Sequence, residues 1–257
     1  MLIVGCGDVG LRVAAVLRER VGLMALTSSS SRVDELRSRG IIPLIGNLDV
    51  PTSLRRLAGL ATRVIHLAPP PGEGEGDPRT RALVAALRLR RAPHSLVYGS
   101  TSGVYGDCQG DIAIETRATH AITARAERRI DAESTVRWHG RATGVRSAVL
   151  RIPGIYAPNR EGGTPHTRLL KRTPVLQVAD DVYTNHIHAD DLARACVAAL
   201  LRGLPQRIYN VNDDTQLKMG DYFDLAADLY GLEQPPRVTR SEAQTLLSPM
   251  LLSFMSE

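Results

Sequence analysis

The stretch Met1–Gly10, MLIVGCGDVG, places three glycines in the spacing G-x-G-x-x-G directly behind a short apolar run. Residues 2–5 predict a buried strand. The segment that follows predicts an amphipathic helix with Val13, Ala14 and Leu17 on one face. A strand, a glycine turn and a helix within about 30 residues form the βαβ context in which this spacing binds a dinucleotide.

Each glycine has a separate physical task in such a turn. Gly5 permits the tight bend, Gly7 lets the backbone approach a pyrophosphate, and Gly10 allows the helix to pack closely on the strand. Asp8 and Val9 begin the helix, whose unpaired N–H groups and positive dipole end face the phosphate. We therefore predict cofactor contacts at all five residues. The alternative is a glycine turn that binds nothing.

The end of the second predicted strand, residues 23–27, decides which dinucleotide is favoured. A carboxylate there would accept a hydrogen bond from the ribose 2′-hydroxyl of NAD. The chain instead has Thr27, a run of serines from Ser28, and Arg32, with no acid before Asp34. Hydroxyls and a guanidinium suit a 2′-phosphate, so NADP is favoured and NAD is the alternative. A polar turn with Arg32 facing solvent would explain the same residues.

Apolar strand-like runs alternate with helical segments through the first 155 residues, which predicts a parallel sheet covered on both faces. The fold class is therefore α/β, a Rossmann-type doubly wound sheet. Beyond residue 155 the alternation loosens, and we predict a smaller region, 156–257, partly interleaved with the first. The six expected strands cover residues 2–5, 23–27, 41–46, 63–68, 95–100 and 147–152.

The composition limits the classes of partner. The 257 residues carry a net charge of +5, but 30 of the 32 basic residues are arginines, spread along the chain and often beside acids. No basic stretch alternates with aromatic residues, so no nucleic-acid partner is expected. No apolar run approaches the ~18 residues of a membrane span, and no leader precedes the first strand, so a cytoplasmic location is expected.

A metal site is not expected. The three cysteines lie far apart, without the spacing of metal ligands. His186 and His188 share one face of a strand-like segment, but a metal would need further ligands. Asp190 is expected to cap the helix that follows.

Three later segments carry a family resemblance: GSTSGVYGD (99–107), RIPGIYAPNR (151–160) and NHIHADDLA (185–193). In this order behind the glycine turn, they resemble the extended short-chain dehydrogenase/reductase superfamily, and more narrowly its atypical NAD-dependent epimerase/dehydratase-like proteins. The resemblance implies a Rossmann sheet with a smaller C-terminal substrate domain, and a small-molecule substrate bound between the two. It also implies that a homodimer can form through helices beside the sheet.

The resemblance also assigns residues. Thr101 falls where the family has the hydroxyl that hydrogen-bonds the substrate oxygen. The family's positions near the adenine fall on Asn47 and Leu48. Ala68 and Pro69 fall in the loop that flanks the ribose and phosphates, and Pro153 falls near the nicotinamide.

The catalytic Tyr-x-x-x-Lys pair of the superfamily is missing from the chain. Its two positions fall on Arg125 and Arg129. Arginine stays protonated and cannot exchange a proton near neutral pH, although Arg129 can hold a ribose or phosphate. Tyr105 is the first candidate for a substitute proton carrier, and packing beneath the site is its alternative role.

Two functions follow from these residues. The first is an NADP-preferring oxidoreductase or epimerase/dehydratase-like enzyme that acts on a small oxygenated or nucleotide-linked substrate by hydride transfer to nicotinamide. The second is a non-catalytic dinucleotide-binding sensor or partner-binding module that has lost the Tyr-x-x-x-Lys pair.

Overall fold

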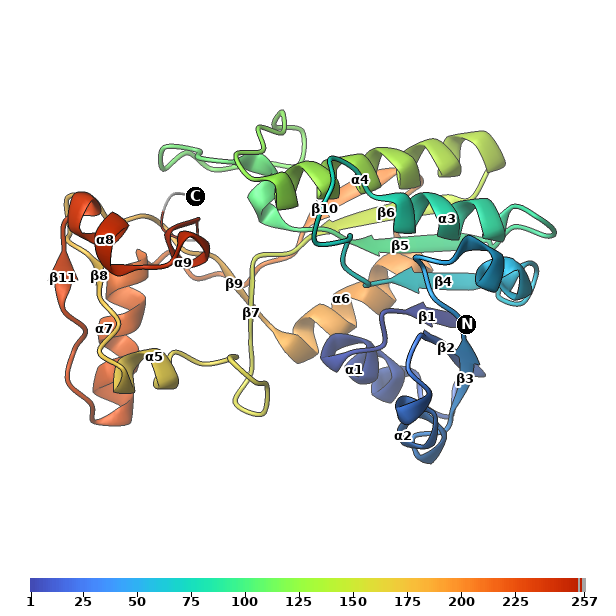
Figure 1. The fold of residues 1–257 in the computed structure, drawn as a ribbon, viewed down its shortest axis with the longest axis horizontal. Helices are drawn as coiled ribbons and strands as arrows, with labels where there is room; N and C mark the ends of the chain where they lie inside the picture. Colours follow the sequence, from blue (N-terminus) through green and yellow to red (C-terminus); the bar gives the residue numbers. More distant parts are fainter. Residues whose placement is uncertain (254, 256–257) are drawn as a thin grey trace.

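A computed structural model describes residues 1–253 and 255 of the chain, which form a larger and a smaller lobe (Figure 1). Within the described residues the larger lobe contains a seven-stranded sheet in which each neighbouring pair is parallel. In spatial order the strands are β10 (Arg207–Asn210), β6 (Arg146–Arg151), β5 (Ser95–Gly99), β4 (Arg63–His66), β1 (Leu2–Val4), β2 (Leu23–Thr27) and β3 (Ile41–Ile45).

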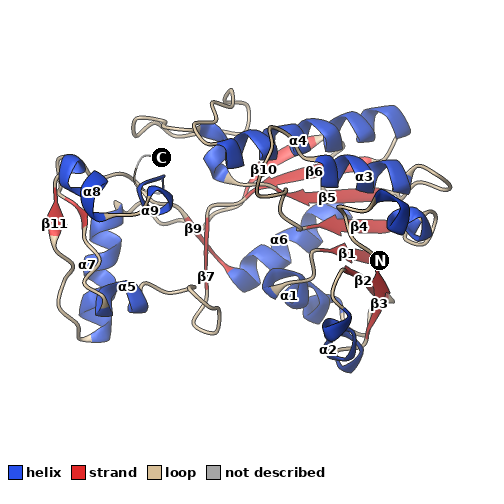
Figure 2. Cartoon of the chain, viewed as in Figure 1, coloured by secondary structure: helices blue, strands red, loops and turns tan. Residues whose placement is uncertain are grey.

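Helices cover both faces of this sheet (Figure 2). The fold predicted from the sequence, a Rossmann-type doubly wound parallel sheet, is confirmed, and the six expected strands form within two residues of their predicted ends. One face carries α1 (Asp8–Leu17), α2 (Val33–Ser38) and α6 (Ala189–Arg202), and the other carries η2 (Pro51–Leu57), α3 (Pro78–Leu87) and α4 (Ala124–Thr143). Two further 3-10 turns, η1 (Ser30–Arg32) and η3 (Ser102–Tyr105), follow β2 and β5.

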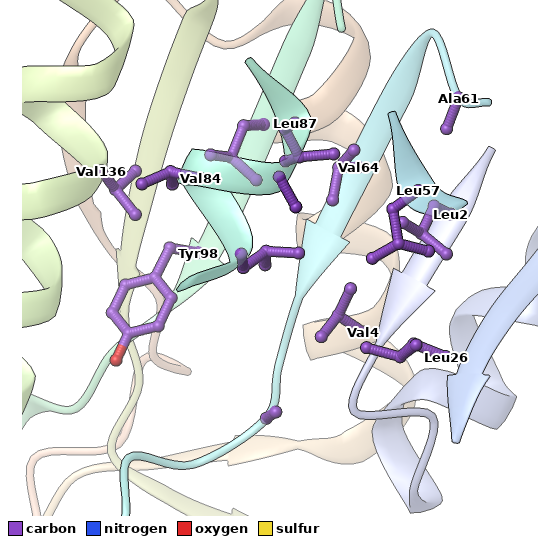
Figure 3. Packing of buried hydrophobic residues seen from close by; sticks show 14 of the residues in the cluster. Leu2, Val4, Leu26, Leu57, Ala61, Val64, Val84, Leu87, Tyr98 and Val136 are labelled. Carbon is purple, nitrogen blue, oxygen red and sulfur yellow. The ribbon is translucent and has the colours of Figure 1, made fainter. Parts of the chain in front are cut away.

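Alternation along the strands divides the larger lobe into two cores, because successive side chains point to opposite faces. On β1, Leu2 and Val4 pack toward α3 and α4, whereas Ile3 packs toward α1 and α6. Figure 3 shows the first core, in which the fully buried Tyr98 of β5 lies beside Val136 of α4.

The smaller lobe is built mostly from the second half of the chain. β7 (Gly154–Tyr156) and β9 (His186–His188) pair in parallel and connect it to the sheet (Figure 1). Its own core lies around Phe223, with Leu176 and Ala243. Its other elements are α5 (His166–Leu170), β8 (Val175–Leu176), α7 (Met219–Tyr230), β11 (Arg237–Val238), α8 (Arg240–Leu246) and α9 (Pro249–Ser253).

The chain returns to the larger lobe after entering the smaller one. α6 packs on α1, and β10 pairs with β6 at the edge of the sheet. Residues 189–210 therefore complete the Rossmann sheet although they follow residue 155 in the sequence.

Two buried histidines have depressed pKa values. Burial, with Arg129 nearby, lowers the pKa of His66 from 6.5 to about 3. Burial beside Arg88 lowers the pKa of His139 to about 4. Both imidazoles are neutral in the folded protein above these values, whereas the unfolded chain takes up a proton on each near pH 6.5. The contribution of the two neutral histidines to the free energy of unfolding is therefore complete above about pH 6.5. It is lost as the pH falls from there toward their folded-state pKa values, because the unfolded chain takes up protons first.

We expect the free energy of unfolding to fall by about 2 kcal/mol for each histidine between about pH 7.5 and about pH 5. Neither ring nitrogen of His139 has a hydrogen-bond partner among the described residues, so His139→Phe should keep the fold and remove its share of the pH dependence. Urea unfolding at both pH values measures this, with His94→Gln at an exposed histidine as the control. Equal pH dependence in His139→Phe and the unsubstituted chain would contradict the prediction.

Candidate active site

The candidate site lies along the edge of the sheet where all seven parallel strands end. The strand order reverses between β1 and β4, which are neighbours in space but not in sequence. In open α/β sheets the loops that leave such a switch point in opposite directions open a crevice for ligands. The predicted residues after β1 to β6 lie in the loops at this edge, at strand ends, or in the helices that follow the strands; Arg129 lies one turn inside α4.

The glycine turn between β1 and α1 has the geometry expected of a phosphate cradle. Gly5 has φ +84°, and a Cβ added to it would lie 2.3 Å from the backbone nitrogen of Ala68 in the loop after β4. A Cβ at Gly10 would lie 3.0 Å from the carbonyl oxygen of Gly5. Gly5 therefore requires glycine, a side chain at Gly10 would be tightly packed, and the structure brings Gly5 and Ala68 together.

Gly7 differs from the other two glycines because a Cβ added there would meet nothing within 4 Å. It is the N-cap of α1 and provides no side-chain cap, so the first N–H groups of the helix, at Asp8 and Val9, stay open to a ligand. Open space over one glycine, beside an uncapped helix N-terminus, fits the pyrophosphate of a dinucleotide.

Beyond β2, Arg32 turns back toward the glycine turn. Its Nη1 donates to the carbonyl oxygen of Cys6 at 2.7 Å, while Thr27 is buried and Ser28 is exposed. Glu35 of α2, which the sequence prediction did not include, accepts from Arg32 at 3.1 Å and lies 3.5 Å from Arg39. The carboxylate of Glu35 is therefore shared between two guanidinium groups.

The loops after β3 and β4 are tied together by an ion pair that the sequence prediction missed. Asp49 accepts two hydrogen bonds from Arg79 of α3, each 2.7 Å long, and Arg79 lowers the pKa of this carboxyl group. Arg79 also donates to the carbonyl oxygen of Pro69 at 3.3 Å. The predicted adenine-side residues Asn47 and Leu48 precede Asp49 directly, so this ion pair fixes both loops.

Thr101 follows β5 and is the N-cap of η3. Its Oγ1 accepts from the backbone N–H of Gly103 at 3.3 Å, which leaves its O–H without a partner in the described part of the chain. The next loop along the sheet lies beside it, because the N–H of Ser102 donates to the carbonyl oxygen of Ile152 at 3.0 Å, one residue before Pro153. The structure thus brings Thr101 and Pro153 to neighbouring strand ends.

A buried ion pair lies beneath this loop. Glu133 of α4 accepts from Ser100 at 2.6 Å and from Nη2 of Arg151 at 2.8 Å, and both partners of the ion pair are almost fully buried. The Arg151 guanidinium also lies 4.6 Å from the ring centre of Tyr105. Tyr105 is itself buried, and its hydroxyl donates to Oδ1 of Asn210 at 2.8 Å.

The two arginines at the Tyr-x-x-x-Lys positions have different surroundings. Arg125 lies in the first turn of α4 and is exposed. Arg129, one turn later, donates through Nη1 to the carbonyl oxygen of Gly99 at 2.7 Å and to the hydroxyl of Tyr98 at 3.1 Å. Burial raises the pKa of Tyr98 to about 12, despite the charge of Arg129. Tyr98 therefore stays protonated near neutral pH.

The junction of β9 and α6 corrects one expectation. His188, not Asp190, is the N-cap of α6, because β9 runs directly into the helix and Nδ1 of His188 accepts from the N–H of Asp190 at 3.3 Å. The Asp190 carboxylate instead accepts from Arg12 at 2.5 Å. His186 stacks on Tyr222 with ring centres 4.4 Å apart.

No metal site is found in the part of the chain that the structure describes: no three His, Cys, Asp or Glu side chains gather to hold an ion. Nor is any helix in residues 1–253 long and apolar enough to cross a membrane.

A hollow of about 470 Å³ lies on the outer surface between α3 and α4, where it includes the half-exposed Trp138. None of the residues that line it belongs to the glycine turn. A homodimer through helices beside the sheet stays a prediction.

Comparison with known proteins places this geometry in a family. The model of the NAD dependent epimerase/dehydratase family matches residues 1–212. A search of curated proteins finds no match. Among solved structures, the chain is similar to a functionally unknown conserved protein from Silicibacter pomeroyi DSS, with 28% identity, 100% of this chain and 86% of the other covered, and a TM-score of 0.77.

Two further solved structures show the same fold at lower identity. A nucleoside-diphosphate-sugar epimerase from Pseudomonas aeruginosa has a TM-score of 0.79 and 19% identity, over 99% of this chain and 85% of the other. A UDP-glucose 4-epimerase from Thermus thermophilus, in complex with NAD, has a TM-score of 0.74 and 22% identity, over 98% and 91%. The resemblance inferred from the three sequence motifs is confirmed.

The family match covers the whole run from the glycine turn through β10, including the strand ends where the predicted residues meet. The chain belongs to the NAD-dependent epimerase/dehydratase family.

Proposed function

We propose that the chain is an NADP-preferring oxidoreductase of the epimerase/dehydratase type that acts on a small oxygenated or nucleotide-linked substrate. The proposal rests on the glycine turn between β1 and α1. A Cβ at Gly7 would meet nothing within 4 Å, whereas a Cβ at Gly5 or Gly10 would press against backbone atoms. A nicotinamide cofactor, when bound, supplies reversible hydride transfer. The residues of the chain bind and orient both ligands.

Thr101 is the proposed group that polarises the substrate oxygen. The backbone N–H of Gly103 holds its Oγ1 as an acceptor, so the hydroxyl proton is directed away from the loop and can be donated. Arg129 is the proposed partner for a ribose hydroxyl or phosphate. Its guanidinium is fixed by Gly99 and Tyr98, and its Nε is buried without a partner among the described residues.

Tyr105 is the proposed proton carrier, and it can act only after its hydroxyl exchanges the bond to Asn210 for one to substrate. The Arg151 guanidinium lies 4.6 Å from the centre of its ring. The packing role remains the alternative, because the side chain is buried against an ion pair.

The second function, a dinucleotide-binding module without catalysis, is favoured by one specific observation. The position of the family tyrosine carries Arg125, which points into solvent and cannot exchange a proton near neutral pH. Such a module would keep the glycine cradle and bind the cofactor without turnover.

Alanine substitutions at two glycines separate folding from binding. We expect Gly7→Ala to change the free energy of unfolding by less than about 0.5 kcal/mol, because its Cβ meets nothing. The same methyl group blocks the approach of a pyrophosphate, so cofactor affinity should fall more than about tenfold.

Gly5→Ala should lower the free energy of unfolding by about 2 kcal/mol or more, because of its positive φ and the contact with Ala68. Urea unfolding and calorimetric titration with NADP⁺ measure both. Unchanged affinity in Gly7→Ala would contradict the placement of the cofactor.

The preference for NADP depends on Arg32. We expect NADP⁺ to bind more tightly than NAD⁺, and Arg32→Gln to weaken NADP⁺ by about tenfold, as loss of a charge-assisted hydrogen bond does. NAD⁺, which lacks the 2′-phosphate, is the internal control. If loss of the bond from Arg32 to Cys6 disturbed the glycine turn, the binding of NAD⁺ would weaken as well. Tighter binding of NAD⁺ to the unsubstituted chain would refute the preference.

Turnover separates the enzyme from the binding module. On a panel of sugar nucleotides, aldehydes and ketones with NADPH or NADP⁺, we expect turnover that falls by about 100-fold or more in Thr101→Ala and in Tyr105→Phe, with cofactor affinity unchanged. A loss smaller than about tenfold in Tyr105→Phe alone would assign that residue to packing. Tight cofactor binding without turnover on the whole panel would favour the binding module.

A further inference from the structure

The first residue of α1 places a negative charge where the cofactor phosphates are expected. Asp8 directly follows Gly7, the N-cap of α1. A free carboxylate there would repel a pyrophosphate that approaches the same helix turn. The electrostatics of the glycine turn therefore depend on what surrounds Asp8.

Two guanidinium groups occupy the two oxygens of this carboxylate. Oδ1 accepts from Nε of Arg12, one turn further along α1, at 3.1 Å. Oδ2 accepts from Nη1 of Arg160 at 2.6 Å. Arg160 lies 152 positions away in the sequence, in the loop that follows β7 and leads into the smaller lobe (Figure 1). The charge of Asp8 is thus balanced by one arginine from each half of the chain.

The loop that carries Arg160 is closed and docked. The N–H of Ala157 donates to the carbonyl oxygen of Gly163 at 3.1 Å, and that of Gly163 donates to Arg160 at 2.9 Å. Asn159 accepts from Nη2 of Arg12 at 2.6 Å, which gives the loop a second contact with α1. This arrangement fixes the guanidinium of Arg160 at the first turn of the helix.

Arg160 keeps most of its donors free. A guanidinium has five N–H donors, and in the described residues the Arg160 side chain donates one hydrogen bond, from Nη1 to Asp8. Its side chain is 28% exposed, so the free donors can reach a ligand. Among the cations of this cluster, Arg12 is different, because its Nε and both Nη atoms already donate to Asp8, Asp190 and Asn159.

We propose that Arg160 is a ligand of the cofactor pyrophosphate, supplied by the loop between the lobes and held in place by Asp8. The inference rests on the proposed function, since it assumes that the glycine turn binds a dinucleotide. Arg160 then adds a charge-assisted hydrogen bond to the N–H groups of α1. Cofactor binding thereby joins the loop of residues 157–163 to the glycine turn.

The decisive comparison is between Arg160→Gln and Asp8→Asn. The first removes the proposed ligand, whereas the second breaks the same ion pair but keeps Arg160. We expect Arg160→Gln to raise the dissociation constants of NADP⁺ and ADP-ribose by about tenfold or more, the loss of one charge-assisted hydrogen bond. Adenosine 2′-monophosphate, which has no pyrophosphate, should bind as before. Asp8→Asn should instead bind NADP⁺ more tightly, because it removes the charge that repels the pyrophosphate and keeps Arg160.

Calorimetric titration gives these constants without any turnover, and thermal unfolding confirms that each variant folds. Arg207→Gln, at an exposed arginine that begins β10 on the opposite edge of the sheet, is the matched control. Equal weakening in Arg160→Gln and Asp8→Asn would show that the ion pair only docks the loop, and unchanged binding in Arg160→Gln would equally overturn the inference. Absence of NADP⁺ and NAD⁺ binding to the unsubstituted chain would instead refute the proposed function itself.

Discussion

The backbone contact between Gly5 and Ala68 is the constraint on which the site depends. It holds the loop after β1 against the loop after β4, at the point where the order of the sheet reverses. Any side chain at Gly5 would separate the two loops, and the crevice between them would change shape. Hydrogen bonds from Leu67 and Ala68 to the carbonyl oxygen of Val4, at 2.7 and 3.2 Å, reinforce the contact.

Arginine side chains supply much of the polar framework around this edge. Arg79, Arg129 and Arg151 each donate two or more hydrogen bonds, which suits the planar, multidentate guanidinium group better than a lysine ammonium. An arginine at the family's tyrosine position, however, cannot exchange protons near neutral pH. In the proposed function, proton transfer is therefore assigned to the hydroxyl group of Tyr105.

The fold could be predicted from the sequence because its signals are local. The strand LIV, the glycine spacing and the first helix all lie within 17 residues, and their periodicity and turn chemistry are properties of short segments. The roles expected of Gly5, Gly7 and Gly10 are likewise predicted from the spacing within this short segment. Contacts between distant segments carried no such signal: nothing near Asp8 indicates Arg160, and nothing near Asp49 indicates Arg79. The helix cap at His188 was missed because Asp190 has the better capping side chain, while the tertiary ion pair with Arg12 takes its carboxylate.

The return of the chain to the larger lobe also has a consequence for synthesis. Leu192, Cys196 and Leu200 of α6 cover one face of the sheet, and β10 covers the free edge of β6. Both elements leave the ribosome only after α5 and β8 of the smaller lobe. For the time needed to translate residues 152–210, the nascent sheet therefore exposes apolar side chains of β4, β5 and β6 and an unpaired strand edge. Such surfaces favour aggregation, so the interleaved topology makes the growing chain most vulnerable just before the larger lobe is complete.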